Sequence, residues 1–258
     1  MNTLIVWLTA LPAMLALGVL AWAIATARRN VGLVDIFWPI FFVVGAAVYA
    51  TAAPSLDARA VLVLLLVTGW ALRLSIYLAV RNWNAPEDHR YRAIRERNDP
   101  GFTWKSIYLV FGLQAMLAWI ISAPLAAAIG SSAPIGALDV FGATLIVFGI
   151  GFEAFADSQL TQFKADQANN GRVMDRGLWR YSRHPNYFGE FCVWWGLYAI
   201  ALSAGAWWTV FSPLFMTLLL LKISGVALLE KDIGERRPAY REYVARTNAF
   251  FPGPPKEA

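Results

Sequence analysis

The chain has 258 residues, of which 58% are hydrophobic and 15% charged, with a net charge of +5 and a mean hydropathy of +0.49. This composition excludes an ordinary soluble globular protein and indicates a membrane protein. The positive charge suits anionic lipid headgroups or an anionic ligand and requires no nucleic acid as partner. The one cysteine, Cys192, excludes an internal disulfide and a CxxC metal site.

Seven apolar runs predict membrane-spanning helices. Crossing ~30 Å of hydrocarbon takes about 20 helical residues, and most of the runs have that length. In chain order they cover Leu4–Ala27, Val34–Ala53, Ala60–Val80, Ile107–Ile129, Leu138–Asp157, Phe188–Leu202 and Trp207–Leu229. The first run has no basic start and no small-residue cleavage site, so we expect a retained helix and not a signal peptide. The expected fold is all-α: a polytopic membrane protein with seven transmembrane helices in a single domain, residues 1–258.

The basic residues predict the orientation of these spans. Of the 22 Lys and Arg residues, 19 lie in the segments that follow the first, third, fifth and seventh spans. Arg73 and Lys222 lie inside spans, and only Arg59 lies in a loop on the opposite side. Because basic loops stay in the cytoplasm, we expect the N-terminus outside and the C-terminus in the cytoplasm. We therefore expect a multi-pass membrane protein with a site that opens to the cytoplasm.

The loop after the third span mixes both charge signs with aromatic residues. Its sequence, Arg81-Asn-Trp-Asn-Ala-Pro-Glu-Asp-His-Arg-Tyr-Arg-Ala-Ile-Arg-Glu-Arg97, predicts a short interfacial helix. Asn98-Asp-Pro-Gly101 is a strong turn signal that ends this helix. The loops on the opposite side are short and almost uncharged, so the chemistry is expected on the cytoplasmic face.

Ionisable residues inside the spans are the first candidates for function, because a charge in hydrocarbon needs a partner. Glu153 and Asp157 are four residues apart in the fifth span and share one helix face. They would repel each other without a cation, a ligand hydroxyl or a protonated partner between them. Asp35 stands near the cytoplasmic start of the second span, and Arg73 and Tyr77 form an i, i+4 pair on the third. Purely structural pairing of the acids with basic residues, and a snorkelling role for Asp35, stay open.

The most polar segment leads into the sixth span: Gly177-Leu-Trp-Arg-Tyr-Ser-Arg-His-Pro-Asn-Tyr-Phe-Gly-Glu190. So many hydrogen-bonding groups at the edge of hydrocarbon indicate the wall of a polar ligand site. Arginines favour phosphates, and carboxylates favour ribose hydroxyls or an amide, so the mixture suits a nucleotide cofactor better than a simple anion. No GxGxxG follows a predicted strand and no GxxxxGK[ST] occurs, which excludes Rossmann and P-loop sites. His89 and His184 would need further ligands to hold a metal, so none is expected.

Several of these residues resemble the C-terminal half of the steroid 5α-reductases. The resemblance rests on Asp157, Lys164, Arg172, Gly177–Tyr181 and Asn186–Glu190 at matching spacing, and on Asp35–Trp38 and Arg81–Tyr91, which resemble motifs of the bacterial DUF1295 branch of that family. It covers most of the chain and implies a seven-helix membrane reductase that binds NADPH from the cytosol. The implied reaction reduces the C=C bond of a 3-oxo-Δ4 steroid or another apolar enone, steroid-like or isoprenoid. The substrate-pocket helices would lie in residues 1–130 and the cofactor-binding half in residues 139–258.

Two other classes of function stay open. Arg183-His-Pro-x-Tyr-x-Gly189 is shared with isoprenylcysteine and phospholipid methyltransferases, which use S-adenosylmethionine, and the tail Tyr240–Pro252 resembles theirs. Those enzymes generally have fewer spans and lack an equivalent of Asp35, which favours the reductase. A non-enzymatic lipid-binding or scaffold protein would leave Glu153 and Asp157 inside the membrane unexplained.

The reductase hypothesis assigns roles in an enone reaction. Delivery of hydride to the β-carbon puts negative charge on the carbonyl oxygen, which a proton donor in a dry pocket stabilises. By resemblance, Asp35 takes the position of the family's acidic residue, where familiar members carry glutamate. Tyr77 is its expected tyrosine partner, and Tyr91 is the second choice. Asp35, Trp38 and Arg73 are assigned to the substrate.

The expected NADPH contacts are polar residues of the second half and the tail: Glu153, Asp157, Lys164, Arg172, Tyr181, Arg183, His184, Asn186, Tyr187, Glu190, Glu230, Arg236 and Tyr243. The 2′-phosphate of NADPH needs more basic groups than S-adenosylmethionine does, and this part of the chain has them. Lipid phosphates are an alternative ligand for Arg183, the aromatic belt of the membrane interface is an alternative place for Tyr187, and packing is an alternative role for the tail tyrosines.

Overall fold

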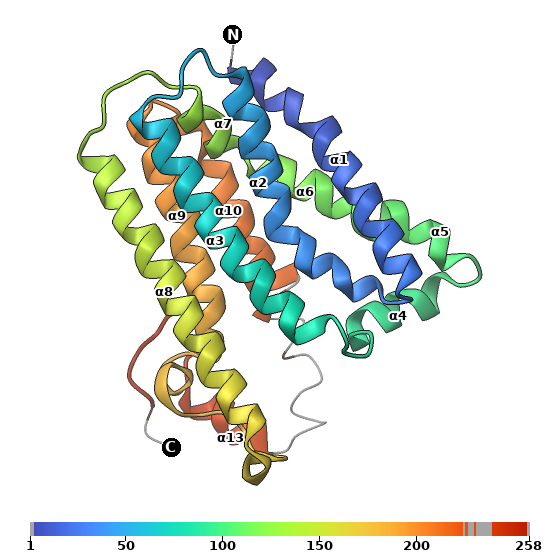
Figure 1. Ribbon diagram of the computed structural model, residues 1–258. Helices are drawn as coiled ribbons and strands as arrows, with labels where there is room; N and C mark the ends of the chain where they lie inside the picture. The colour runs from blue at the N-terminus through green and yellow to red at the C-terminus, as the bar shows by residue number, and fades with distance from the viewer. Residues whose placement is uncertain (1–2, 224, 227–229, 231–238, 257–258) are drawn as a thin grey trace. The chain divides into compact units, whose positions relative to one another are not determined.

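The computed structural model describes residues 3–223, 225–226, 230 and 239–256 (Figure 1). This part of the chain contains helices and no strand, which confirms the all-α expectation for it. The helices are α1 (Thr3–Ala27), α2 (Val34–Ala52), α3 (Ala58–Asn82), α4 (His89–Asn98), α5 (Phe102–Ser106), α6 (Leu113–Ile121), α7 (Ala123–Ile129), α8 (Ala137–Ala165), α9 (Pro185–Ser203), α10 (Phe211–Leu218) and α13 (Ala239–Arg246). The chain divides into two compact units, one made of Met1–Asp139 with Ile200–Thr209 and the other of Val140–Ala199 with Val210–Ala258.

Five helical segments of the described part are long and apolar enough to cross a bilayer, so the protein is a multi-pass membrane protein. They cover Thr3–Ala27, Val31–Ala52, Ala58–Asn82, Phe102–Ile121 and Ala137–Ala165. The sixth expected span lies within α9. The seventh begins in a shorter apolar helix, Trp207–Ile223, and the rest of it falls largely outside the described residues. The number of seven spans and their orientation stay predictions.

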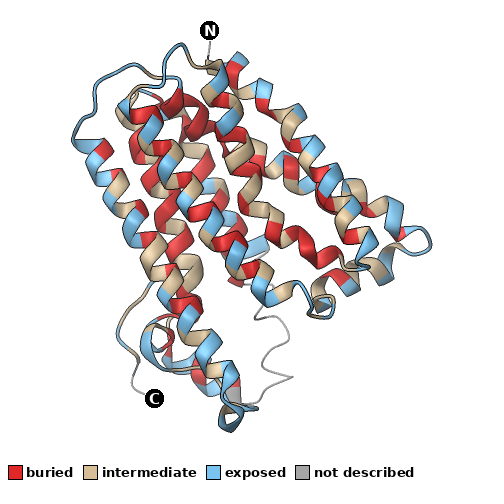
Figure 2. Ribbon diagram, viewed as in Figure 1, coloured by how far each residue is buried: buried red, intermediate tan, exposed pale blue. Residues whose placement is uncertain are grey.

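The fourth span differs from the expected run Ile107–Ile129. The chain is already helical from Phe102, because Gly101 takes a left-handed conformation (φ 89°) that lets the turn pass into α5. α6 ends at Ile121, since Pro124 has no backbone N–H to continue the helix. The apolar run therefore forms two helices, and the second of them, α7, is buried along its whole length (red in Figure 2).

The fifth span also differs, because α8 does not end at Asp157 but continues to Ala165. The polar sequence Ser158–Ala165 was expected to be a loop, yet it contains neither glycine nor proline, and polar side chains do not break a helix that has left hydrocarbon. As a result, a single helix carries Glu153, Asp157 and Lys164.

In the first unit, α2 packs against both α1 and α3. Two tryptophans join α1 to α6: the rings of Trp7 and Trp119 stack with centroids 4.6 Å apart and an interplanar angle of 13°. Each indole donates its N–H to the backbone carbonyl of the other residue, at 2.8 Å from Trp7 and 2.9 Å from Trp119. The pair therefore satisfies its own polar groups and needs no water inside the membrane.

Arg59, the basic residue expected on the side opposite to the other charges, is buried at the start of α3 with 1% of its surface exposed. Its Nε donates to Asp139 Oδ1 at 2.7 Å and its Nη2 to Asp139 Oδ2 at 3.0 Å. Its remaining N–H groups reach Ser131 Oγ, Ser203 Oγ and the carbonyls of Ala133 and Pro134. The guanidinium is thus fully hydrogen-bonded, and it fixes the loop between α7 and α8.

In the second unit, α8 and α9 make backbone contact through glycines spaced seven residues apart. A Cβ atom on Gly149 would lie 2.5 Å from the carbonyl oxygen of Gly189, and one on Gly196 would lie 2.6 Å from that of Gly142. Small residues permit this close approach, which is how many membrane helices associate. The contact brings the acid-bearing turns of α8 against the first turns of α9, where the polar segment Gly177–Glu190 ends.

Candidate functional site

The candidate site of the first unit is built around a hydrogen bond between Tyr91 and Asp35. Asp35 lies in the first turn of α2 and Tyr91 in α4, and the Tyr91 hydroxyl donates to Asp35 Oδ1 at 2.5 Å. Tyr91 is buried, and the Asp35 side chain is 22% exposed. Burial and the neighbouring Asp35 carboxylate raise the pKa of Tyr91 well above its usual range. Tyr91 is therefore a hydroxyl that keeps its proton and can donate it in a hydrogen bond.

Arg90 occupies the other oxygen of the same carboxylate. Its Nη2 lies 3.4 Å from Asp35 Oδ2, while its Nε donates to Asp88 Oδ1 at 3.0 Å. Burial disfavours the charged form of Arg90, but Asp35 and Asp88 outweigh it and hold the pKa of the guanidinium above its usual range. The sequence interpretation did not assign Arg90 to the site. The sequence offered one indication of its role: Arg90 lies next to Tyr91 in a predicted helix that carries charges of both signs.

The start of α4 is fixed by caps and tethers, which explains why Arg90 and Tyr91 reach α2. Asp88 is the N-cap of α4 and accepts a hydrogen bond from the Arg90 backbone N–H at 2.9 Å. Glu87 accepts from the backbone N–H of Val31 at 2.8 Å and from Arg95 Nη2 at 2.8 Å. The residues before α2 and those before α4 are therefore bonded to each other, and the expected short helix in this loop is confirmed.

Gln114 of α6 is a second group that the sequence interpretation missed. Its Nε2 lies 3.4 Å from the Tyr91 hydroxyl, so that hydroxyl accepts from Gln114 and donates to Asp35. A neutral amide inside an apolar run carries little signal in the sequence, because only the folded chain brings it to Tyr91. The three side chains form a hydrogen-bonded row, Gln114 to Tyr91 to Asp35.

The other residues expected near the substrate lie on α2 and α3. Trp38 packs edge-on against Phe42, with ring centroids 5.3 Å apart. Tyr77 lies under the guanidinium of Arg81, whose Cζ is 5.3 Å from its ring centroid. Of the two candidate tyrosines, Tyr91 and not the preferred Tyr77 therefore carries the hydrogen bond to Asp35. Arg73 lies on α3, one helical turn before Tyr77, as the sequence spacing implies.

The candidate site of the second unit gathers carboxyl groups where α8 meets α9. Glu153 and Asp157 are each 3% exposed, and Glu190 is 7% exposed. Asn186 Nδ2 lies 3.4 Å from Asp157 Oδ1, while Asn186 Oδ1 accepts the backbone N–H of Tyr187 at 3.1 Å. Among the residues that the structure describes, no group of three or more His, Cys, Asp or Glu could hold a metal ion. The cluster thus consists of three buried carboxyl groups and one amide.

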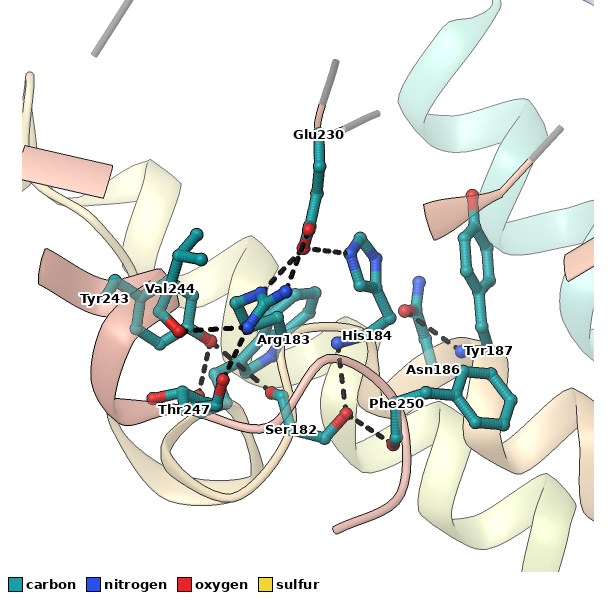
Figure 3. Close-up of polar contacts among 11 residues, drawn as sticks. Ser182, Arg183, His184, Asn186, Tyr187, Glu230, Tyr243, Val244, Thr247 and Phe250 are labelled. Carbon is teal, nitrogen blue, oxygen red and sulfur yellow. Dashed lines mark hydrogen bonds and ion pairs between the residues drawn. The ribbon is translucent and has the colours of Figure 1, made fainter. Parts of the chain in front are cut away.

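Arg183 lies beside this cluster in sequence, but its guanidinium is engaged with the protein (Figure 3). Its Nε and Nη2 donate to the two oxygens of Glu230 at 2.7 and 2.8 Å, and its Nη1 donates to the carbonyls of Val244 and Thr247 at 3.2 and 2.5 Å. At least four of its five N–H groups are thus used within the unit. The expected contact of Arg183 with cofactor phosphates stays a prediction, and the geometry gives it a second role as the clamp of the C-terminal segment.

Glu230 joins this clamp to His184. His184 Nε2 and Glu230 Oε1 are 2.9 Å apart, and the His184 ring stacks on Tyr187 with centroids 5.7 Å apart (Figure 3). Burial disfavours the Glu230 anion, but hydrogen bonds from His184 and Arg183 outweigh it and lower its pKa to about 2. Glu230 is consequently an anion at neutral pH, held between two side chains of the polar segment.

Tyr243 also holds the tail to the polar segment. It is almost fully buried in α13, and its hydroxyl donates to the carbonyl of Trp179. The Trp179 indole in turn donates to the carbonyl of Ala156 on α8 at 3.0 Å. These contacts favour the packing role that was left open for the tail tyrosines.

Two cationic side chains expected to contact NADPH, Lys164 and Arg172, are exposed, and so are their neighbours in sequence Arg176 and Arg180. Tyr181 is exposed as well, at 44%. Arg236 lies outside the described residues. In the second unit, the structure thus brings Asp157 and Asn186 together, ties Arg183, His184 and Glu230 into one cluster, and leaves the basic groups on the surface.

Fold and sites together define a class: a multi-pass helical membrane protein with a hydrogen-bonded carboxylate–tyrosine pair in one unit and a cluster of buried acids beside an amide in the other. Residues 21–247 match the family model described as "Protein of unknown function (DUF1295)", and the chain belongs to this family. An uncharacterized protein of Schizosaccharomyces pombe is 27% identical over 268 residues, covering 92% of this chain and 76% of the relative. No solved structure shows a significant match. The expected DUF1295 membership is confirmed, and the link to steroid 5α-reductases stays a prediction.

Proposed function

We propose that the protein is a membrane-embedded, NADPH-dependent reductase of the C=C bond of an apolar enone, with a 3-oxo-Δ4 steroid as the first substrate to test. The observation that carries the proposal is the short hydrogen bond from Tyr91 to Asp35, in a unit whose helices are long and apolar enough to cross a bilayer. The resemblance to steroid 5α-reductases supports the same reaction.

The chemistry of the Tyr91–Asp35 pair suits an enone carbonyl. When bound, NADPH would supply a hydride; its addition to the β-carbon would move the electron pair of the C=C bond onto the carbonyl oxygen as an enolate. A hydroxyl that donates to this oxygen stabilises the developing charge, and more so away from bulk water. The enolate then takes up one proton at the α-carbon, so one enone, one NADPH and one proton give the saturated ketone and NADP⁺. Asp35 and Tyr91 hold the carbonyl end in this scheme.

The second unit fits NADPH by the chemistry of its side chains. Asp157 supplies buried carboxylate oxygens, which accept from ribose hydroxyls or the nicotinamide amide, and Asn186 supplies an amide beside it. Lys164 and Arg172 are exposed cations that suit the phosphates, including a 2′-phosphate. The left-handed Gly177 (φ 55°) starts the segment that ends in these groups.

We also propose the number of membrane spans and their orientation. Seven spans, with the N-terminus outside and the C-terminus in the cytoplasm, would place the basic loops on the cytoplasmic side of a bacterial inner membrane. NADPH is a cytosolic cofactor, so this orientation agrees with the proposed reaction.

Cofactor titration of the purified chain in detergent tests the proposal. We expect saturable binding of NADPH and weaker binding of NADH, together with enone-dependent oxidation of NADPH. Glu190→Ala should lose cofactor affinity, whereas Asp35→Ala should keep it and lose turnover. Tight binding of S-adenosylmethionine with none of NADPH would overturn the reductase in favour of a methyltransferase.

A further inference from the structure

Both oxygens of the Asp35 carboxylate have donors. Tyr91 donates its hydroxyl to Oδ1 at 2.5 Å, and Arg90 presents Nη2 to Oδ2 at 3.4 Å. A guanidinium has only donors and stays charged in proteins, so a proton on Oδ2 would point at another hydrogen. Tyr91 already accepts from Gln114 Nε2 at 3.4 Å, which directs its own hydrogen to Asp35. The arrangement therefore suits a carboxylate and not a neutral acid.

Arg90 is held at this position by more than its contact with Asp35. Asp88 receives both the side-chain Nε and the backbone N–H of Arg90, at 3.0 and 2.9 Å. The Arg90 Cζ also lies 5.7 Å from the ring centroid of Tyr91. Because Arg90 is held at its backbone N–H and at its guanidinium, it loses little further conformational freedom when it faces Asp35.

We propose that Arg90 is a positioning residue that keeps Asp35 an anion, so that Tyr91 is the group that donates hydrogen to a bound carbonyl. This inference rests on the proposed function and changes the role expected for Asp35, from proton donor to acceptor. When the Tyr91 hydroxyl turns to a substrate oxygen, Arg90 still compensates the charge of Asp35. Without Arg90, a bare carboxylate would face the negative charge that forms on the enolate oxygen.

Groups other than Arg90 also act on the charge of Asp35. Burial of Asp35 and the charge of Asp88 favour its neutral form, whereas Arg90, Tyr91 and, more weakly, Arg81 favour the anion. Arg81 of α3 makes no ion pair with Asp35 among the described contacts. His89 lies 3.3 Å from Asp88 and not at Asp35. Arg90 is the group whose removal should change the charge of Asp35 most.

Infrared spectroscopy of the full chain, labelled with ¹³C at its aspartate carboxyls and placed in phosphatidylcholine nanodiscs, tests the inference without cofactor or substrate. A protonated-carboxyl band that is missing from Asp35→Asn identifies Asp35. We expect no such band in the wild type at pH 7. In Arg90→Gln the pH midpoint at which this band disappears should rise by about one unit or more, so the band should persist to a higher pH than in the wild type. Arg90→Lys should restore the wild-type behaviour, and Arg92→Gln, an exposed neighbour on α4, is the matched control.

A band from Asp35 in the wild type at pH 7 would overturn the inference even if Arg90→Gln failed to fold. An unchanged titration in folded Arg90→Gln would overturn it as well. A second measurement uses the C=O stretch of a bound 3-oxo enone: its hydrogen-bond shift should be lost in Tyr91→Phe and kept in Asp35→Asn. If no enone binds or is reduced while the Asp35 band behaves as expected, the proposed function fails and the role of Arg90 stands.

Discussion

Tyr91 and Asp35 are 56 residues apart in the chain, and their contact at 2.5 Å depends on single residues around them. Asp88 caps the helix that carries Tyr91, and Glu87 ties that helix to the residue three positions before the start of α2. A carboxylate with a short bond from a hydroxyl polarises that hydroxyl and fixes its direction. Replacing each tyrosine in turn is therefore the sharpest test of which one acts on the substrate.

Tyr91→Phe should lower kcat for enone reduction by about 10²–10⁴-fold, because it removes the proposed hydrogen-bond donor and leaves the ring in place. The dissociation constant for NADPH should stay unchanged. Tyr77→Phe is the control, since Tyr77 stacks under Arg81 and makes no bond to Asp35 among the described contacts. Steady-state kinetics and cofactor titration give both quantities. Equal turnover of Tyr91→Phe and the wild type would rule out Tyr91 as the donor.

Glu230 should make the C-terminal clamp sensitive to acid. Its pKa falls from an ordinary 4.5 to about 2, because hydrogen bonds from His184 and Arg183 outweigh burial. Since the folded chain binds fewer protons than the unfolded one, the contribution is present above pH 4.5 and is lost as the pH falls toward 2. It amounts to at most about 3 kcal/mol.

Hydrogen exchange of Val244–Phe250 across this pH range measures the effect. The protection factor, which is the intrinsic exchange rate at each pH divided by the observed rate, should fall in the wild type below pH 4.5. In Glu230→Gln it should already be low at neutral pH. Protection that is the same in both proteins at neutral pH would show that Glu230 does not hold the tail.

At the scale of elements, the glycine contact between α8 and α9 positions the acid–amide cluster. Gly142 and Gly149 on one helix meet Gly196 and Gly189 on the other, so the backbones approach at two levels. A Cβ on Gly189 would also lie 2.7 Å from the Cβ of Glu153. The contact that packs the helices is thus the contact that sets Glu153 against the start of α9.

Gly149→Ala should destabilise the protein by about 1–3 kcal/mol, because its Cβ would lie 2.5 Å from a backbone oxygen that cannot rotate away. Gly151→Ala, two residues later on the same helix, has no atom within 4 Å of the new Cβ and should be neutral or slightly stabilising. Thermal unfolding in detergent compares the two. NADPH affinity should fall only in Gly149→Ala. Matching unfolding temperatures for both variants would contradict the close backbone contact.

At the scale of the whole molecule, apolar length predicted the membrane class and five of the spans, because burial in hydrocarbon depends on composition over about 20 residues. The break at Ser122 was missed, since Pro124 acts locally inside a run that stays apolar on both sides. The continuation of α8 was missed for the opposite reason: polar residues suggested a loop where the helix goes on.

The site could be anticipated only in part. Asp35 and Tyr91 stand out as polar groups in motifs, whereas Gln114 and Arg90 gain meaning from contacts across the fold. Arg183 was assigned to a ligand because its type suits phosphates, and its engagement with Glu230 and two carbonyls could not be read from the sequence.

Orientation can be measured because the native thiol is shielded. Cys192 is 4% exposed, so maleimide labelling should come from the introduced cysteines and not from the native thiol. A cysteine at exposed Glu96 should react with a membrane-impermeant maleimide only in inverted vesicles, and one at exposed Ser132 only in intact cells. The reverse pattern would invert the topology, and labelling of both from the same side would contradict an odd number of spans between them.

The stacked pair of Trp7 and Trp119 has an optical consequence. Two indoles with centroids 4.6 Å apart and nearly parallel planes share their electronic excitation, so they behave as one chiral chromophore. Their near-ultraviolet circular dichroism should contain a paired band that disappears in Trp7→Phe or Trp119→Phe and exceeds the sum of single tryptophans. The intensity of this band therefore measures whether α1 and α6 stay together in a bilayer, without an added fluorescent dye.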